Sequence, residues 1–351
     1  MAPQFRLAAE WAPQGAVLMA WPHADSDWAP IMEQAEPVFR AIALAILADE
    51  NLIVCCRNDS QAAEIKRLLT LESASQNAGG TVHVVAVPTN DTWARDFGPL
   101  TLSDGTASRL VDPRFNAWGN KFESALDNDV NQLLHRGGLY GALPMDPMDL
   151  VVEGGALETD GEGTLLATRP CVLNPNRNGD VDTGWIEARL RTHLGLERFL
   201  WLDHGALEGD DTDGHIDTLA RFCGPGHIVY QACDERADSH YTELQAMARE
   251  LSALERADGT AYRLTGLPWP DPVHAADGRR LPATYANFLI TNQAVLVPTY
   301  GVPQDDAACR ILGSCFPGRR ITAVQCRPLL EQGGSLHCLT MQLPPGVGPD
   351  E

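Results

Sequence analysis

Amphipathic segments and short apolar runs alternate along the chain. In five places a segment with apolar residues at helical spacing precedes a run rich in branched or aromatic residues. Proline and glycine are spread throughout as turn residues, and no segment resembles a linker. We therefore predict one α/β domain over residues 1–351, built from five helix-to-strand units: 60–74 with 81–88, 121–138 with 149–157, 185–195 with 198–205, 240–257 with 261–269, and 304–316 with 320–330.

Polar, glycine-containing segments follow the predicted strands. One residue from each can serve as a marker: Asp96, Glu153, His215, Trp269 and Cys338, at intervals of 57, 62, 54 and 69 residues. A recurring interval of this size is typical of repeated architectures, although a doubly wound sheet gives a similar alternation. In a repeated fold the equivalent loops meet on one face, which would bring these distant residues together.

Composition and charge indicate which kinds of binding partner and which cellular compartment to expect. Apolar residues make up 44% of the 351 residues, enough for a large core, and the net charge is −21. That charge argues against nucleic acid and favours either a cationic ligand or an ordinary acidic surface. No apolar run is long enough to span a membrane, and the N-terminal residues lack a basic region with an apolar run of signal-peptide length. Nine cysteines, an odd number without a CxxC pair, favour a reducing cytoplasm.

The segment around His215 and the last cysteine supply a base and a nucleophile. If His215 begins a strand, Asp217 lies two residues on and points to the same face. Cys338 follows a Gly333–Gly334 pair on a predicted short strand, where the glycines would let the chain bend toward the other loops. His337 would then point to the opposite face from Cys338, so we do not expect it to be the partner base.

Two further loops supply carboxylates. Asp96 follows Arg95 and lies three residues after Trp93, and Glu153 ends an apolar run before two glycines that permit a close approach. Taken alone, Asp96 could be a turn residue, Glu153 a solvated strand end, and the His215–Asp217 pair a feature of a sheet surface. One cysteine, one histidine and three carboxylates at successive loops are harder to explain structurally.

Metal binding is one competing use of these residue types. The segment 209–220 resembles a calcium loop, but glycine and alanine stand where its first and last ligands are required. A zinc site from His204, His215, Asp217 and Cys338 has no supporting ligand spacing. A cysteine beside a histidine suits covalent catalysis. Carboxylates are poor donors for an oxyanion but hold a planar guanidinium well, so we predict a cationic guanidino substrate.

Six motifs carry a family resemblance over nearly the whole chain. In order they are EWAPQGAVLMAWPH, NDTWARDFGP, VVEGGALETDGEGTLLATRPCVLNPNRN, DDTDGHIDTLARF, YANFLITNQAVLVPTYG and GGSLHCLTMQLP. They resemble the agmatine deiminase and bacterial peptidylarginine deiminase family. The resemblance implies a five-bladed α/β propeller (pentein) of the guanidine-modifying superfamily, with strand–helix modules around a central pocket. It also implies that no metal or organic cofactor is used.

The resemblance also implies roles for the marked residues. Cys338 would be the nucleophile, His215 the general acid/base, and Glu153 the carboxylate that orients the histidine and helps to hold the substrate. Asp96 and Asp217 would clamp the guanidinium, and Trp93 would line the substrate channel. Ala94 and Phe97 depart from many agmatine-specific members, which concerns the tail of the substrate rather than the chemistry.

The activity implied is a cytoplasmic agmatine deiminase of polyamine biosynthesis. It would convert agmatine to N-carbamoylputrescine and ammonia through a covalent amidino-cysteine, a step toward putrescine. A deiminase of free or peptidyl-arginine is the main alternative; a metal-dependent hydrolase and a catalytically silent binding propeller are the others. A homodimer is compatible with the resemblance, and we expect no membrane or nucleic-acid partner.

Overall fold

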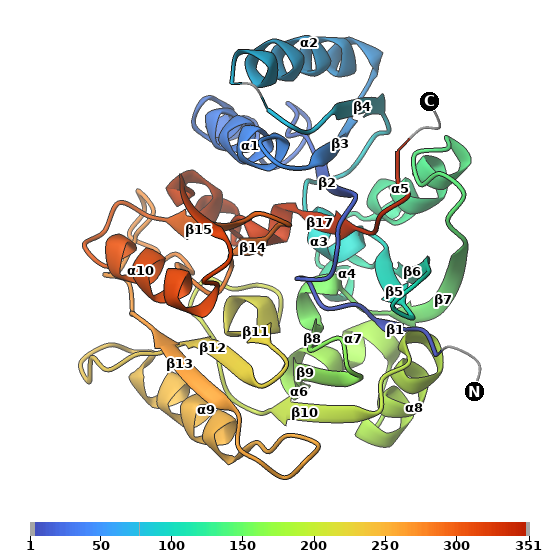
Figure 1. Cartoon of the computed structure of the whole chain (residues 1–351). Helices are drawn as coiled ribbons and strands as arrows, with labels where there is room; N and C mark the ends of the chain where they lie inside the picture. The colour runs from blue at the N-terminus through green and yellow to red at the C-terminus, as the bar shows by residue number, and fades with distance from the viewer. Residues whose placement is uncertain (1–3, 77, 349–351) are drawn as a thin grey trace.

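The strands of the chain form five separate sheets. The computed structural model describes residues 4–76 and 78–348, and within them each sheet has three or four strands. Figure 1 shows the sheets around the centre of the molecule, with helices α2, α5, α8, α9 and α10 toward the outside. Every sheet contains a parallel strand pair joined by a helix, as parallel pairing requires.

One sheet joins the two ends of the described chain, with the order β17-β2-β3-β4. Strand β17 pairs antiparallel with β2, so that Met341 lies opposite Leu18. The catalytic candidates near the C-terminus are thereby fixed beside the N-terminal strands. The elements are β2 (Ala16–Ala20), η1 (Ala29–Ile31), α1 (Met32–Leu47), β3 (Asn51–Cys56), α2 (Asp59–Ser75), β4 (Val82–Ala86) and β17 (Met341–Leu343).

The next two sheets follow in sequence and have the orders β1-β5-β6-β7 and β10-β9-β8. The first contains β1 (Arg6–Leu7), α3 (Ala94–Phe97), β5 (Leu100–Ser103), β6 (Ser108–Arg114), α4 (Ala117–Asn120), α5 (Ala125–Arg136) and β7 (Met145–Val151). The second contains η2 (Gly154–Ala156), β8 (Glu158–Thr159), β9 (Thr164–Thr168), α6 (Arg169–Val172), α7 (Pro175–Asn178), α8 (Thr183–Leu194) and β10 (Arg198–Leu202).

The last two sheets have the orders β11-β12-β13 and β14-β15-β16. The first is accompanied by η3 (Ile216–Thr218) and contains β11 (Ala220–Gly224), β12 (His227–Gln231), α9 (Tyr241–Ala253) and β13 (Arg263–Leu267). The second contains β14 (Leu289–Ile290), β15 (Ala294–Thr299), α10 (Asp305–Cys315) and β16 (Arg320–Gln325). Two 3₁₀ helices, η4 (Arg327–Gln332) and η5 (His337–Leu339), lead from β16 to β17.

Local sequence accounts for the ends of the long helices. The side chain of Asn58 caps α2 by accepting a hydrogen bond from the Gln61 backbone N–H, and Asp182 caps α8 in the same way. Helix α8 ends at Gly195, whose φ of 63° is left-handed and favours glycine. All residues of β2 and β15 are buried. These apolar strands need a covering on both faces, which the helices and neighbouring sheets provide.

The order of the five predicted helix-to-strand units is confirmed, in the pairs α2 with β4, α5 with β7, α8 with β10, α9 with β13 and α10 with β16. Two of the predicted strands extend too far, because residues 154–156 form η2 and residues 327–332 form η4. Two other local predictions are wrong. His215 does not begin a strand, because the following residues form η3, and Cys338 lies in η5 rather than in a strand. No helix in the described part of the chain is long and apolar enough to cross a membrane.

Candidate active site

A cavity of about 140 Å³ lies where these loops and short helices meet. Three of the predicted site residues line it: Trp93, Asp96 and Cys338. The fourth marker, Trp269, lines a different cavity and donates a hydrogen bond from its indole to Asp238. The other lining residues are Asp27, Asp91, Trp118, Phe122, Gly209, Asp211, Thr212, Thr218, Arg279, Glu331, Gln332, Gly333 and Gly334.

Cys338 is held at this cavity by an amide side chain that sequence reasoning missed. Asn287 Nδ2 donates to Cys338 Sγ at 3.2 Å, and its Oδ1 accepts from the His337 backbone N–H at 3.0 Å. Burial and the charges of Asp217 and Asp96 raise the pKa of the Cys338 thiol well above its usual value. These neighbours favour the neutral thiol over the thiolate.

His215 is buried between two carboxylates. Its Nδ1 lies 3.6 Å from Asp96 Oδ1, and its Nε2 lies 3.9 Å from Glu153 Oε2. Neither ring nitrogen has a hydrogen-bond partner among the described residues. Burial acts to lower the pKa of His215, but the charge of Asp96 and the neighbouring Cys171 outweigh it and raise the pKa well above its usual value. These neighbours favour the protonated form of the ring.

Asp96 lies in α3, and each of its two carboxylate oxygens accepts a hydrogen bond. Trp118 Nε1 donates to Oδ2 at 3.0 Å, and the Gly155 backbone N–H donates to Oδ1 at 3.0 Å. Burial raises the pKa of Asp96 to about 6, and the charge of His215 opposes that rise. The carboxylate is thus ionised at neutral pH and fixed in direction, as a clamp on a cation requires.

Asp217 has one occupied and one free oxygen. Its Oδ2 lies 2.7 Å from His337 Nδ1 and 3.8 Å from Cys338 Sγ, whereas its buried Oδ1 has no partner in the described structure. Burial acts to raise the pKa of Asp217, but the hydrogen bond and charge of His337 outweigh it and keep the pKa below its usual range. A charged, unsatisfied oxygen in a buried site is costly unless a ligand binds it.

His337 lines a second cavity and not that of Cys338, as predicted, but the reason given for that prediction was wrong. We expected His337 to face away from the site because neighbouring strand residues point to opposite faces. In the 3₁₀ helix η5 that alternation does not apply, and His337 binds Asp217 through Nδ1 and Glu10 through Nε2 at 2.8 Å. His337 thus orients Asp217 from behind, while His215 is the histidine between the carboxylates.

Glu153 is paired with an arginine that the sequence analysis did not single out. Arg177 Nε lies 2.9 Å from both oxygens of Glu153, and its terminal nitrogens donate to Asp213 Oδ2 and to the Thr212 carbonyl. Burial would raise the pKa of Glu153, but His215 and Arg177 hold it below its usual range. Arg177 belongs to the quoted LNPNRN motif, which was the available signal.

Two positions at the site require glycine because neighbouring side chains lie close to where a Cβ atom would be. A Cβ atom at Gly155 would lie 2.6 Å from His215 Nδ1, 2.7 Å from Asp96 Oδ1 and 3.2 Å from Asp217 Oδ2. A Cβ atom at Gly334 would lie 2.3 Å from the ring of Trp93. The first distances show that three predicted site residues converge on one small volume. Gly334 also lets the segment before Cys338 pack directly on Trp93, in addition to the bend at Gly333, whose φ is 83°.

The described residues do not form the zinc set considered from the sequence. His204, part of the zinc set considered above, instead binds Glu250 at a half-exposed position, with Nδ1 2.6 Å from Oε1. Ligand atoms of Glu153, Cys171 and His215 do lie within 4.8 Å of one another. However, Arg177 occupies both oxygens of Glu153. Cys171 thus joins the site as a buried thiol beside His215, another residue that sequence reasoning missed.

Comparison with known proteins gives a consistent family. The chain is 34% identical to an agmatine deiminase of Stutzerimonas stutzeri over 97% of this chain and 95% of that protein. A substrate-bound cysteine-to-serine variant of Campylobacter (C. jejuni) agmatine deiminase superposes with a TM-score of 0.88 at 33% identity, covering 99% of this chain and 97% of that one.

A second solved structure has higher sequence identity. A Porphyromonas gingivalis protein, provisionally named an arginine deiminase, superposes with a TM-score of 0.90 at 46% identity, covering 98% of this chain and all of that one. Residues 6–344 match the sequence model for Porphyromonas-type peptidyl-arginine deiminases. The agmatine deiminase of Stutzerimonas stutzeri matches this chain along almost its full length. The chain therefore belongs to the Porphyromonas-type peptidyl-arginine deiminase family.

Proposed function

We propose that the protein is an agmatine deiminase, which hydrolyses the guanidinium of agmatine to N-carbamoylputrescine and ammonia. The observation that carries the proposal is the convergence of His215, Asp96 and Asp217 around Gly155, next to the Cys338 thiol. Curated relatives and a substrate-bound structure named as agmatine deiminases support the choice of substrate. The enzyme is a hydrolase of carbon–nitrogen bonds in linear amidines.

The proposed reaction begins with binding of the guanidinium between two carboxylates. Asp96 presents a fixed carboxylate, and the free Oδ1 of Asp217 accepts hydrogen bonds from the opposite side of the guanidinium. A bound cation offsets the two charges that raise the pKa of the Cys338 thiol, so substrate binding favours loss of the thiol proton to solvent and leaves the thiolate for attack. Trp93 and Trp118 line the route of the apolar chain of the substrate.

Catalysis then proceeds in two halves. Cys338 Sγ forms a bond to the central guanidinium carbon, and His215 gives a proton to the departing nitrogen, which leaves as ammonia. The resulting amidino-cysteine is attacked by water, whose proton returns to His215. Collapse breaks the carbon–sulfur bond, releases the ureido product and restores the thiol. Glu153, held by Arg177, keeps the imidazole in position between the two carboxylates.

The acidic lining of the cavity favours a substrate with a second cation. Agmatine carries a primary amine at the end of its chain, and Asp27, Asp91, Asp211 and Glu331 line the same cavity as Cys338. Asp91 is already bound by the indoles of Trp28 and Trp93. Glu331 is likewise paired with Arg327, whose Nη1 lies 2.8 Å from Oε1. Asp27 and Asp211 are therefore the candidates for holding the distal amine.

The finer structural and cellular predictions belong to the same proposal. The five sheets around one site support a five-bladed α/β propeller acting as one catalytic domain over 1–351. The nine cysteines, all within the described residues, are free thiols, which supports a cytoplasmic location. We retain the prediction of catalysis without a metal or organic cofactor. A homodimer also remains compatible with the proposal.

One observation favours arginine or peptidyl-arginine as a second candidate substrate. Arg279 lines the cavity and is held only loosely, 3.9 Å from Glu331 Oε2 and 3.9 Å from Asp277 Oδ2. Its half-exposed guanidinium could bind the carboxylate of arginine or a carbonyl of a peptide. The 46% identity to a protein provisionally named an arginine deiminase points the same way.

Ammonia release from agmatine, arginine and a blocked peptidyl-arginine, measured side by side, tests the proposal. We expect agmatine to give the highest kcat/KM, and Arg279→Ala to leave that value unchanged or higher. If arginine is the better substrate and Arg279→Ala lowers its kcat/KM about tenfold or more, the second candidate is correct. Arg310→Ala, an exposed change in α10, is the matched control.

The two remaining alternatives have their own outcomes. A metal-dependent hydrolase would lose activity on prolonged chelation while the protein stays folded, and would regain it with zinc. A silent binding propeller would release no ammonia from any of the three compounds. The agmatine proposal requires activity that survives the chelator at a temperature where the chelated protein is folded.

A further inference from the structure

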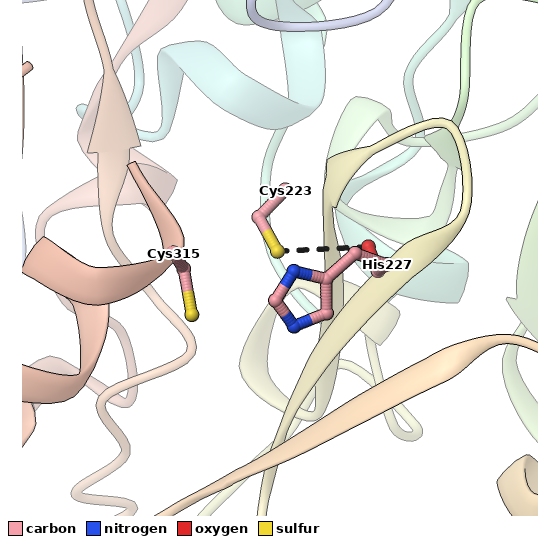
Figure 2. Close-up of side chains that lie close together, drawn as sticks. All are labelled: Cys223, His227 and Cys315. Carbon is pink, nitrogen blue, oxygen red and sulfur yellow. Dashed lines mark hydrogen bonds between the residues drawn. The ribbon is translucent and has the colours of Figure 1, made fainter. Parts of the chain in front are cut away.

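A second group of metal-ligand side chains lies outside the candidate active site. Cys223 is in β11, His227 begins β12, and Cys315 ends α10. One ligand atom of each lies within 4.8 Å of the others. Figure 2 shows the two sulfur atoms and the imidazole turned toward a common space between two segments of the chain. None of these residues lines the cavity that contains Cys338.

The backbone brings the first two residues together through a tight turn. Strands β11 and β12 are antiparallel neighbours, and the register shifts between Phe222 and Gly224. This irregularity places Gly224 opposite His227 and leaves Cys223 at the turn, with its thiol 3.6 Å from the His227 carbonyl oxygen. Cys315 comes from the next module of the chain, so the group spans two sheets with their helices.

The orientation of His227 suits a ligand. Its Nε2 lies 2.8 Å from Thr265 Oγ1 in β13, and Figure 2 shows the other ring nitrogen on the side facing Cys223. A histidine that ligates a metal usually donates its second N–H to an oxygen acceptor, which fixes its tautomer. Thr265 provides that acceptor, so Nδ1 is the nitrogen available to a metal.

The donor set selects the class of metal. Two thiolates and one imidazole favour zinc or another soft to borderline divalent ion over calcium or magnesium. With bonds of about 2.3 Å, two sulfur ligands of tetrahedral zinc lie about 3.8 Å apart. The ligand atoms lie within 4.8 Å of one another, so side-chain rotations need to bring the sulfur atoms closer by about 1 Å at most. Zn²⁺ with two thiolates and a neutral imidazole has no net charge, which reduces the cost of a half-buried site.

We propose that Cys223, His227 and Cys315 form a zinc site in which His227 binds through Nδ1 and water completes the tetrahedron. The ion would fasten the β11–β12 turn to the end of α10, and hence the sheet β11-β12-β13 to the neighbouring sheet β14-β15-β16. Its role is structural, because the three ligands lie outside the cavity of the reacting groups. The proposal does not depend on which guanidino compound the enzyme hydrolyses.

The test uses the full-length protein, freed of metal by chelation under reducing conditions and then titrated with zinc or cobalt(II). We expect one equivalent of zinc to bind and to raise the melting temperature. Cobalt should give thiolate-to-metal charge-transfer absorption. Cys223→Ser and Cys315→Ser should each weaken this absorption by removing one thiolate. These two variants and His227→Gln should each lower zinc affinity by at least about tenfold.

Two further variants sharpen the test. Thr265→Val keeps all three ligands but removes the acceptor for His227 Nε2–H, so zinc affinity should fall about 10–100-fold. Cys309→Ser changes a half-buried cysteine in the same helix and should leave zinc binding unchanged. His227→Gln is the least disruptive ligand change, and a native circular dichroism spectrum shows that its loss of zinc is not unfolding.

Three results would overturn the proposal. The first is failure of the reduced wild-type protein to bind zinc. The second is zinc that still binds with wild-type affinity in folded His227→Gln and in Cys315→Ser, which would place the metal elsewhere, such as at Glu153, Cys171 and His215. The third is a Cys223–Cys315 disulfide that persists under these reducing conditions and prevents zinc binding. Loss of deiminase activity bears on the proposed reaction, whereas these readouts concern only the metal.

Discussion

Gly155→Ala adds one methyl group at the point where the candidate catalytic groups converge. Gly155 lies in η2, directly after the segment that carries Glu153, and its backbone N–H donates to Asp96. Its φ lies outside the left-handed region, so the backbone itself can accept alanine. The expected effect therefore comes from the new methyl group and its contacts with side chains.

The size of the effect follows from the distances. The new Cβ would lie 2.6 Å from His215 Nδ1 and 2.7 Å from Asp96 Oδ1, whereas ordinary contact begins at 3.4 Å. Each group must therefore move by about 0.7–0.8 Å. A displacement of about 1 Å at reacting groups can reduce catalysis about 100-fold. Overpacking a buried site costs about 1–3 kcal/mol of folding free energy, so most of the protein should remain folded.

The assay is kcat/KM for ammonia release from agmatine, with thermal unfolding measured on the same samples. We expect a loss of about 100-fold and a modest fall in melting temperature. Gly313→Ala is the control, because it adds a methyl group in α10 with only an ordinary contact to Ile321. A folded Gly155→Ala enzyme that keeps more than half of wild-type kcat/KM would refute the convergence of His215, Asp96 and Asp217 on the reacting substrate.

Three further predictions concern individual groups. Cys338→Ala should lower the turnover rate by several decades in a protein that still folds, whereas Cys309→Ser should keep normal turnover. More than a tenth of wild-type activity in Cys338→Ala would contradict the role of Cys338 as nucleophile. Asp217→Asn should lower kcat/KM at least about thirtyfold, because loss of one side of a buried charge pair costs about 2 kcal/mol or more; normal turnover would make Asp217 structural. Because Asp96 has a pKa of about 6, kcat/KM should fall as pH drops through 6 and its carboxylate becomes protonated. Trp118→Phe removes a hydrogen bond that lowers this pKa and should shift the acid limb to higher pH; an unshifted limb would assign it to another group.

The repeated α/β organisation could be predicted because the spacing of apolar residues within each segment indicates a helix or a strand. Helices such as α2 and α9 have one buried face, and the parallel strands beside them are short apolar runs. The order of the marker residues then indicated which loops would meet. That reasoning was correct for Asp96, His215 and Cys338, whose side chains lie around one site.

The details of the site depend on contacts between residues distant in sequence. Asn287 binds Cys338, 51 residues away, and Arg177 in α7 binds Glu153, 24 residues away. Neither contact can be inferred from the residue types that neighbour it in the sequence. The strand predicted through Cys338 was wrong for a similar reason. Its apolar neighbours are buried in a short 3₁₀ turn, and three buried residues in a row do not distinguish that turn from a strand.

The N-terminal motif explains how so many buried carboxylates can coexist near the cavity. Glu10 lies 2.8 Å from His337 and also pairs with Arg221, which in turn binds Glu158. Burial would raise the pKa of Glu10, but Arg221 and His337 outweigh it and hold the pKa well below its usual value. Glu10 therefore stays charged and fixes His337, and His337 occupies only one oxygen of Asp217. The other oxygen has no partner among the described residues, and binding a guanidinium there would remove the cost of leaving it unpaired.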